Sequence, residues 1–465
     1  MTASLRPQRL LASFSMAVIL GLSVGYSHAM DLLLALEHAQ QNDPEYLAAR
    51  AAADAGETQR DQGTSLWLPH IEANVLTGKS THDAVTKGAQ FGAPAFGVSN
   101  DVRFETSIRQ GTLERYEIRF EQALFDRKRL AQSRQQTLTA DTAVITLHHE
   151  RQALILRVVE RYFDVLLTRD RLESLQAQQH AVTLLQTEIQ DRFDLGDVPI
   201  TDTYETHARA EAIRAQVLQA EVQREISEIA FIDLTGAPLQ QIGRLHGKQL
   251  QELTEIEALE VWLKRADQHN PTLLRQRKGL AIAEEEVAAY SAGATPTLAL
   301  IGSASHENLH GSGSFGRARN KADSWVVGLQ LSIPLYTGGY RSAKYREALH
   351  QRDGTRFSGQ HLQQQIERHT RAAWLGITVG SARVQALEQT LKSTEARLDA
   401  THIGHNVGDR TTLELLEAQN AATTARVDLL QARIDLILNR LRLAALAGNL
   451  DASLLAHINT FLNFP

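Results

Sequence analysis

The 465-residue sequence contains no cysteine, and this absence excludes several kinds of chemistry. Without thiols the chain can form no disulfide, no thiolate metal site and no cysteine nucleophile, and it cannot carry a lipid on an N-terminal cysteine. Proline and aromatic residues are also scarce, with 10 prolines and 6% aromatic residues. Long segments rich in Ala, Leu, Gln, Glu and Arg take their place, which is typical of long helices and coiled coils.

An excess of positive charge is missing as well. The 48 Lys and Arg residues against 54 Asp and Glu residues give a formal net charge of −6. Proteins that bind nucleic acid usually carry a basic patch or stripe, so this composition disfavours that function. Beyond the N-terminal region, no run approaches the 18 or more apolar residues that a membrane helix needs.

Residues 1–29 are predicted to be a signal peptide. Arg6 and Arg9 supply its positive region, residues 10–25 are mostly apolar, and residues 27–29 are Ser-His-Ala, a small-x-small cleavage site. The alternative is an uncleaved membrane anchor, but the apolar run is short for a membrane span. We therefore expect an exported protein whose mature chain begins near Met30.

The sequence contains two copies of one unit. Residues 193–205 resemble residues 405–419, and aligning Gly196 with Gly408 gives an offset of 408 − 196 = 212 residues. Self-similarity at a fixed offset over a long span indicates structural repeats. We predict a first repeat, a linker and a second repeat, at residues 30–242, 243–256 and 257–465.

Each repeat is expected to open with a helix and to continue with a strand pair, at 69–125 and at 296–336. Residues 115–121 alternate apolar and charged side chains, which is a period-two strand signal. Polar loops are expected inside the pairs, from about 78 to 112 and from about 305 to 323. Strands of about ten residues with an aromatic-rich apolar face suit a membrane barrel. A half-buried sheet in a soluble protein is the alternative, although so few strands would have little to pack against.

Long helices are predicted after each strand pair, at 126–236 and at 337–448, because apolar residues recur there every seven positions. At 1.5 Å per residue, a helix from Asp126 to Leu195 would be about 105 Å long. A turn at Gly196 then leads to a returning helix.

Two motifs that could indicate a chemical function have simpler interpretations. Residues 311–316 match the GxGxxG pattern, but no helix is expected after them to receive a pyrophosphate, so we predict a flexible loop. His402 and His405 are spaced for a metal, but no third ligand completes the set, so surface or pore-lining histidines are expected. No nucleophile, base and orienting group recur at an interpretable spacing. The sequence therefore predicts no enzyme, no cofactor and no metal site.

The turn motifs, the strand pairs and the doubling together resemble the TolC family of outer-membrane efflux and secretion channels. The resemblance covers essentially the whole mature chain, and its most specific parts are residues 193–202, 334–339 and 407–418. It implies a mixed α and membrane β fold in the cell outer membrane. A homotrimer would form one 12-stranded barrel from four strands per chain, continued by a long periplasmic α-helical coiled-coil barrel. The residues agree in part, because four strands cannot close a barrel and open edges are not tolerated in lipid. They leave a dimer and a trimer open, whereas the resemblance favours three chains.

The resemblance also assigns roles near the two helix turns. Asp202 matches the family's first-half acid and Arg410 its second-half arginine, which together hold the periplasmic end closed. Glu414 and Glu417 match the paired acids of the pore constriction, although the family usually has Asp there. They are three residues apart on a helix, so both can face the lumen and form a cation-selective girdle in a trimer. The alternative is a solvated helix face. His405 stands where a tyrosine usually adds a third contact to the gate.

The function implied by the resemblance is a passive exit duct for efflux of small molecules, type I protein secretion, or both. An inner-membrane ABC or RND-type transporter would drive it through a periplasmic adaptor (membrane fusion) protein, and outer-membrane lipid would surround the strands. The adaptor is expected to dock at the turns, on Gly196, Asp197, Gly408 and Asp409. The alternative function is that of a periplasmic coiled-coil structural or adaptor protein.

Overall fold

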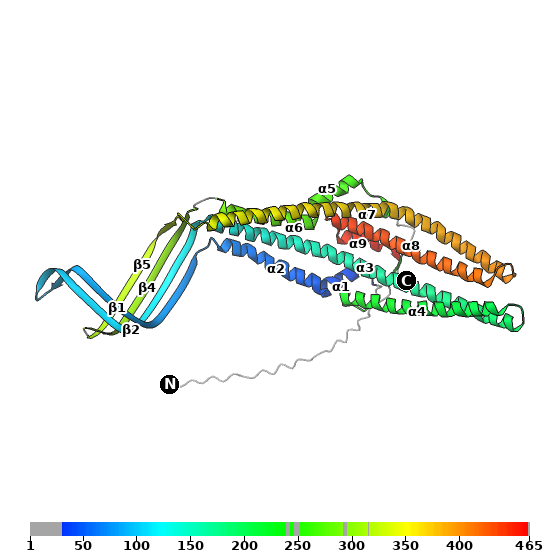
Figure 1. Ribbon diagram of the computed structural model, residues 1–465, viewed down its shortest axis with the longest axis horizontal. Helices are drawn as coiled ribbons and strands as arrows, with labels where there is room; N and C mark the ends of the chain where they lie inside the picture. Colours follow the sequence, from blue (N-terminus) through cyan, green and yellow to red (C-terminus); the bar gives the residue numbers. More distant parts are fainter. Residues whose placement is uncertain (1–29, 239–241, 246–251, 292–294, 315, 464–465) are drawn as a thin grey trace, which may run out of the picture.

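The computed structural model describes residues 30–238, 242–245, 252–291, 295–314 and 316–463. The protein is elongated, with a four-stranded sheet at one end and long helices that run away from it (Figure 1). The predicted signal peptide lies outside the described residues. Within these ranges, no helix combines the length and the hydropathy that crossing a membrane requires.

The sheet is built from both halves of the chain. Its strands are β1 (His70–Ala93), β2 (Gly97–Phe125), β4 (Thr297–Gly313) and β5 (Gly316–Ser332), in the spatial order β1-β2-β4-β5. All neighbouring strands are antiparallel, and the β2–β4 pairing joins the first half to the second. β1 and β5 are therefore the two edge strands of this sheet.

One face of the sheet carries rows of apolar side chains that run across all four strands. The pairing places one such row on Ile71, Phe120, Gly302 and Val327, and the next on Ala73, Ile118, Ala304 and Trp325. Trp325 is 78% exposed and Val327 is 70% exposed, so no residue in the described part of the chain covers them. The other face is mainly polar, because side chains alternate between the two faces of a strand.

The polar loops expected inside the strand pairs are mostly strand instead. β1 continues to Ala93 and β2 begins again at Gly97, so the connection is a short turn. The expected loop at 311–316 is wrong at its start, since residues 311–313 end β4. Glycine is needed there: a Cβ on Gly313 would lie 1.5 Å from the carbonyl oxygen of Ser107. The end of β4 therefore packs closely against β2 of the first strand pair.

Each half contributes two shorter helices and two long ones. In the first half these are α1 (Leu32–Asn42), α2 (Pro44–Ser65), α3 (Arg127–Asp194) and α4 (Ile200–Thr235). In the second half they are α5 (Leu259–His269), α6 (Pro271–Tyr290), α7 (Tyr340–Asn406) and α8 (Thr412–Leu446), followed by α9 (Ala452–Asn459). α3 has 68 residues and α7 has 67, and Asp126 caps α3 by accepting from the amides of Lys128 and Arg129.

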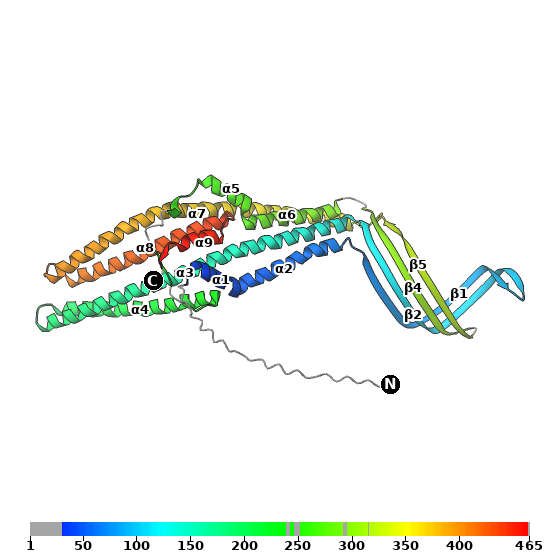
Figure 2. The same cartoon turned by 180° about the vertical axis from the view of Figure 1, so that it is seen from behind.

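Two joints connect the returning helices to the shorter helices. At the first joint, the side chain of Asn42 donates to the carbonyl oxygen of Thr235, over 2.9 Å. At the second, Asn270 donates to the carbonyl oxygen of Leu446, over 3.0 Å. As a result α4 and α2 lie end to end along α3, and α8 and α6 lie end to end along α7 (Figures 1 and 2).

The largest core cluster lies where α1, α3, α8 and α9 meet, close to these joints. Tyr162 of α3 is fully buried in it and contacts Phe163 and Phe231 edge to face. Its hydroxyl donates to the carbonyl oxygen of Met30 and accepts from the amide of Gly243, both over 3.1 Å. Burial raises the pKa of Tyr162, so the phenol stays neutral and keeps both hydrogen bonds. A short pair of strands, β3 (Arg244–Leu245) and β6 (Leu462–Asn463), lies next to this core.

Candidate functional site at the helix turns

Two helix turns lie at the end of the molecule that is farthest from the sheet (Figures 1 and 2). One connects α3 to α4 around Gly196, and the other connects α7 to α8 around Gly408. The two helix pairs pack together behind the turns, where Leu415 and Leu416 of α8 belong to the same core cluster as Ile189 of α3. The structure therefore brings both sequence-predicted turn motifs to one end.

The two turns have the same backbone geometry. Gly196 and Gly408 both have φ of 82°, a left-handed conformation that glycine adopts without steric cost. In each turn the amide of the following aspartate bonds back to the helix it leaves, Asp197 to Arg192 over 2.9 Å and Asp409 to Gly404 over 2.8 Å. This is the helix-ending pattern that glycine favours. A Cβ at either glycine would meet only open space, so both turns are exposed tips.

A capping box organises the second turn. The Glu414 carboxylate accepts from the amide of Thr411 over 2.8 Å, and the Thr411 hydroxyl accepts from the amide of Glu414 over 3.2 Å. Arg410 adds an ion pair to the same carboxylate, over 2.8 Å. The amide of Thr411 and the guanidinium of Arg410 both lower the pKa of Glu414. The carboxylate therefore stays ionised near neutral pH and fixes the start of α8.

His405 is buried, contrary to the expectation of a surface or pore-lining histidine. It is 4% exposed, and its Nε2 lies 3.4 Å from the hydroxyl of Thr412, across the turn. His402 is exposed and faces Asn406 instead. Among the residues that the structure describes, no group of three or more His, Asp and Glu side chains could hold a metal ion.

The remaining predicted residues, Asp202 and Glu417, lie on the first turn of α4 and on the second turn of α8. Asp202 is half-buried and accepts a 3.3 Å hydrogen bond from Thr201. Glu417 is exposed. The structure brings Arg410 to Glu414, and Asp202 lies on the other helix pair. The role of Thr411 was missed, although the Thr-x-x-Glu spacing that signals a capping box is present in the sequence.

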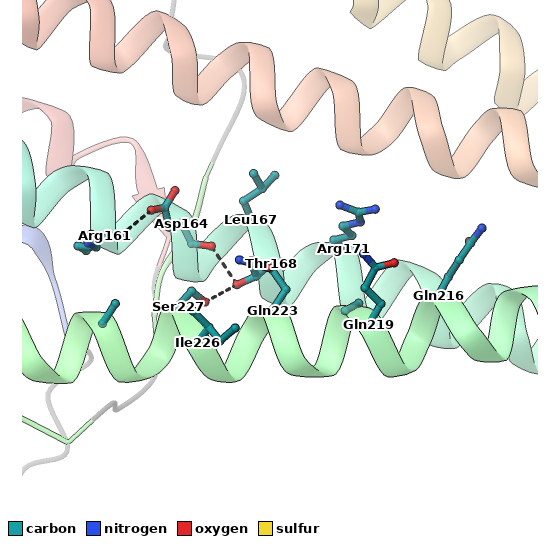
Figure 3. A pocket seen from close by; sticks show the side chains of 12 residues that line it. Arg161, Asp164, Leu167, Thr168, Arg171, Gln216, Gln219, Gln223, Ile226 and Ser227 are labelled. Atoms are coloured by element: carbon teal, nitrogen blue, oxygen red, sulfur yellow. Dashed lines mark hydrogen bonds and ion pairs between the residues drawn. The ribbon is translucent and has the colours of Figure 1, made fainter.

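A cavity of about 380 Å³ lies between α3 and α4, away from the tips (Figure 3). The hydroxyl of Thr168 donates to the backbone oxygen of Asp164 over 2.9 Å and lies 2.8 Å from the hydroxyl of Ser227. Arg169 crosses to Glu228 over 2.8 Å. Burial raises the pKa of Asp164. The Thr168–Ser227 and Arg169–Glu228 contacts join the two antiparallel helices.

Solved outer-membrane channels share this fold. The Campylobacter jejuni CmeC outer membrane channel matches with a TM-score of 0.73 at 15% identity, over 98% of each chain. The outer membrane protein VceC from Vibrio cholerae matches with a TM-score of 0.71 at 15% identity, over 90% of this chain and 97% of that one. These matches establish an outer-membrane channel fold.

The family follows from the sequence. The family model for outer membrane efflux proteins matches residues 35–237 and 262–449, so the chain belongs to that family. Outer membrane protein TolC from Vibrio cholerae is 26% identical, over 91% of this chain and 92% of its own. The alkaline protease secretion protein AprF from Pseudomonas aeruginosa is 28% identical, over 91% of this chain and 85% of its own. The protein is an outer-membrane exit duct, and its family and neighbours are channel proteins rather than enzymes.

Proposed function

We propose that three copies of this chain form one channel, with a shared β-barrel in the outer membrane and a helical tunnel in the periplasm. The tunnel gives efflux substrates or a secreted protein a path out of the cell. An inner-membrane transporter drives export through a periplasmic adaptor that docks on the two tips. Two relatives are named for protease secretion, AprF from Pseudomonas aeruginosa and PrtF from Dickeya chrysanthemi. Their names support protein secretion as one function of the channel.

The observation that carries this proposal is the open sheet. β1 and β5 are edge strands, and the apolar rows end at both edges. Lipid cannot satisfy the backbone groups of an open edge, so the edges must pair with other chains. When β5 of one copy pairs with β1 of the next, cyclic symmetry closes the ring. Three copies of four strands give 12, which is enough for a barrel with an open lumen.

The tips supply the gate in this proposal. Arg410 lies two residues before the first residue of α8, and Asp202 is the third residue of α4, so both residues lie next to a turn. In one chain Arg410 donates a hydrogen bond to Glu414 over 2.8 Å. In the closed trimer the same guanidinium also reaches Asp202 of a neighbouring copy. His405 contributes by holding Thr412 and the turn in place, and Glu414 and Glu417 form the acidic constriction.

The mass of the purified protein tests the assembly. In detergent, native mass spectrometry should give the mass of a trimer. The trimer should also resist dissociation by heat, because each barrel is shared between chains. Extraction from cells should require detergent and the outer-membrane fraction. A monomer that keeps its full β content, or release by osmotic shock alone, contradicts the proposal and favours a periplasmic structural protein.

A further inference from the structure

The face of the sheet that carries the apolar rows, which we call the apolar face, becomes basic at the end farthest from the helices. Every second residue of β5 lies on this face, as Trp325 does. From Trp325 toward the turn to β4, the same alternation passes Asp323 and then reaches three cations, Lys321, Arg319 and Arg317. The apolar face therefore ends in positive charge.

The strand pairing brings two further cations to these three. Arg109 of β2 and Arg317 of β5 lie in one row, because both pair with Ser312 of β4. Lys79 of β1 lies in the row of Arg319. Residues of one row share a face, and neighbouring strands are about 4.8 Å apart. We call these five exposed residues the basic cluster: Lys79, Arg109, Arg317, Arg319 and Lys321.

The positive charge of the basic cluster is not neutralised by ion pairs. On the polar face of the same sheet, Arg115 donates to Glu307 over 2.6 Å and Arg119 donates to Glu117 over 2.8 Å. In the part of the chain that the structure describes, no member of the basic cluster forms an ion pair, although Arg319 donates to the side-chain oxygen of Asn308 over 2.9 Å. The two faces therefore treat their arginines differently.

Two carboxylates lie in the same rows as the basic cluster, and both have other partners. Glu114 accepts from the side-chain amide of Asn308 over 3.0 Å. Asp323 lies 2.5 Å from the ring nitrogen of His306. Two carboxylates against five cations leave an excess of positive charge on this surface, and such a surface attracts anions.

The far part of the β1–β2 hairpin leaves the basic cluster uncovered, because it crosses the polar face instead. Leu309 lies two residues from Glu307, hence on the polar face, and is only 2% exposed. A Cβ on Gly111 of β2 would lie 2.6 Å from the side chain of Ile108 and 3.0 Å from that of Leu309. The hairpin thus folds over the polar side of β4, and the apolar face stays open to its surroundings.

The basic cluster lies a short distance beyond the apolar rows. Lys321 is four residues from Trp325, about 13 Å along β5. β4 follows α6 and β5 precedes α7, so the turn between the two strands is at the end away from the helices (Figure 1). With the helices in the periplasm, the cluster is level with the head groups of the outer leaflet. In an outer membrane this leaflet carries a glycolipid whose sugars are phosphorylated.

We propose that the basic cluster binds the phosphorylated sugar head group of this glycolipid. Arg317 and Arg319 donate to phosphate oxygens, for which the planar guanidinium is well suited, and Lys321 adds a third positive charge. The acyl chains of the same lipid lie along Trp325 and Val327. The inference rests on the proposed function in one respect, namely that the apolar face is in contact with the membrane.

Binding of lipid A, the diphosphorylated anchor of this glycolipid, tests the proposal on the full-length protein in detergent. Native mass spectrometry counts the lipid molecules bound per chain over a titration. Lipid A should bind saturably, and the same lipid without its phosphates should bind roughly 100-fold more weakly, because each cation near an anionic lipid is worth about a fivefold change. The triple variant Arg317→Gln, Arg319→Gln, Lys321→Gln should bind the two lipids equally weakly.

A second triple variant is the matched control. Arg368→Gln, Arg371→Gln, Lys392→Gln removes two arginines and one lysine from exposed positions of α7, and should bind both lipids as the wild type does. Unchanged binding of lipid A by the cluster variant overturns the proposal, as does equal binding of the two lipids by the wild type. Displacement of lipid A by inorganic phosphate at the same concentration also overturns it, and would assign the cluster to a soluble anion.

The same spectra separate this inference from the proposed function. A trimer of normal conductance that does not distinguish the two lipids contradicts the lipid site alone. A monomer whose basic cluster still selects the phosphorylated lipid contradicts the proposed assembly alone.

Discussion

At the scale of single residues, Arg410 has the clearest expected effect. Its ion pair with Glu414 is exposed, and an exposed ion pair contributes little by itself because water and salt screen it. Three copies act on one closed state, so Arg410→Ser should raise single-channel conductance in planar bilayers and leave the thermal stability of the trimer unchanged. Arg214→Ser is the matched control, since Arg214 forms an exposed helical pair with Glu211 away from the turn. A wild-type conductance for Arg410→Ser would show that other contacts hold the gate.

The constriction offers a second test at this scale, through pH. The pKa of Glu414 lies below 4.5, its ordinary value, so its charge and the capping box persist above that pH and are lost only as the pH falls through the lowered value. In a Glu417→Ala variant, where Glu414 is the remaining acid, cation selectivity should therefore survive at pH 4.5 and fall in stronger acid. Reversal potentials in a salt gradient measure this.

The double variant Glu414→Ala, Glu417→Ala removes both acids of the proposed constriction and serves as the comparison for that experiment. It should have weak cation selectivity at every pH and little block by multivalent cations, because no carboxylate of the proposed constriction remains in any of the three chains. Selectivity that persists in the double variant would assign the filter to other residues.

At the scale of elements, the two turns are the parts most exposed to a partner. Gly196→Trp and Gly408→Trp put a large side chain on an exposed tip and in a left-handed backbone conformation. Both should abolish export, seen as dye retention or loss of a secreted protein, while the trimer still assembles. Gly354→Trp is the control, because Gly354 lies inside α7 with open space around its Cβ position. Normal export in both tip variants would move the docking site elsewhere.

The elements also show what the sequence could predict. Heptad spacing predicts α3 and α7 well, because one long helix repeats the same packing over its whole length. The outer part of β1 was missed, since Lys79, Ser80 and Thr81 give no apolar alternation; hydrogen bonds to β2 keep it a strand. At the site, the glycine turns follow from local sequence. Burial of His405 depends on the packing of two helices, and the Asp202 contact of the proposed gate depends on a second chain.

At the scale of the whole molecule, the exposed apolar rows of the sheet should determine how the protein sits in the membrane. Val327→Arg puts a charge on the face that lipid would cover, and should destabilise the trimer by about 2–4 kcal/mol if Val327 lies near the bilayer midplane. Val326→Arg is the matched control, because the neighbouring residue faces the other side of β5. Heat resistance of the trimer in detergent compares the two. Equal losses would mean that the apolar face is not the lipid face.

The two joints have a mechanical consequence for the assembled molecule. A continuous helix transmits twist along its backbone hydrogen bonds, but at each joint the ladder stops and a single side-chain hydrogen bond bridges the helix ends. Each half therefore combines one continuous helix, α3 or α7, with two shorter helices that lie end to end beside it. We expect spin-label distances between the tips to vary more than distances between α2 and α6 beside the sheet. A twist applied at the tips, where the adaptor is proposed to dock, would be taken up in part at the two joints, while α3 and α7 carry the rest toward the membrane end.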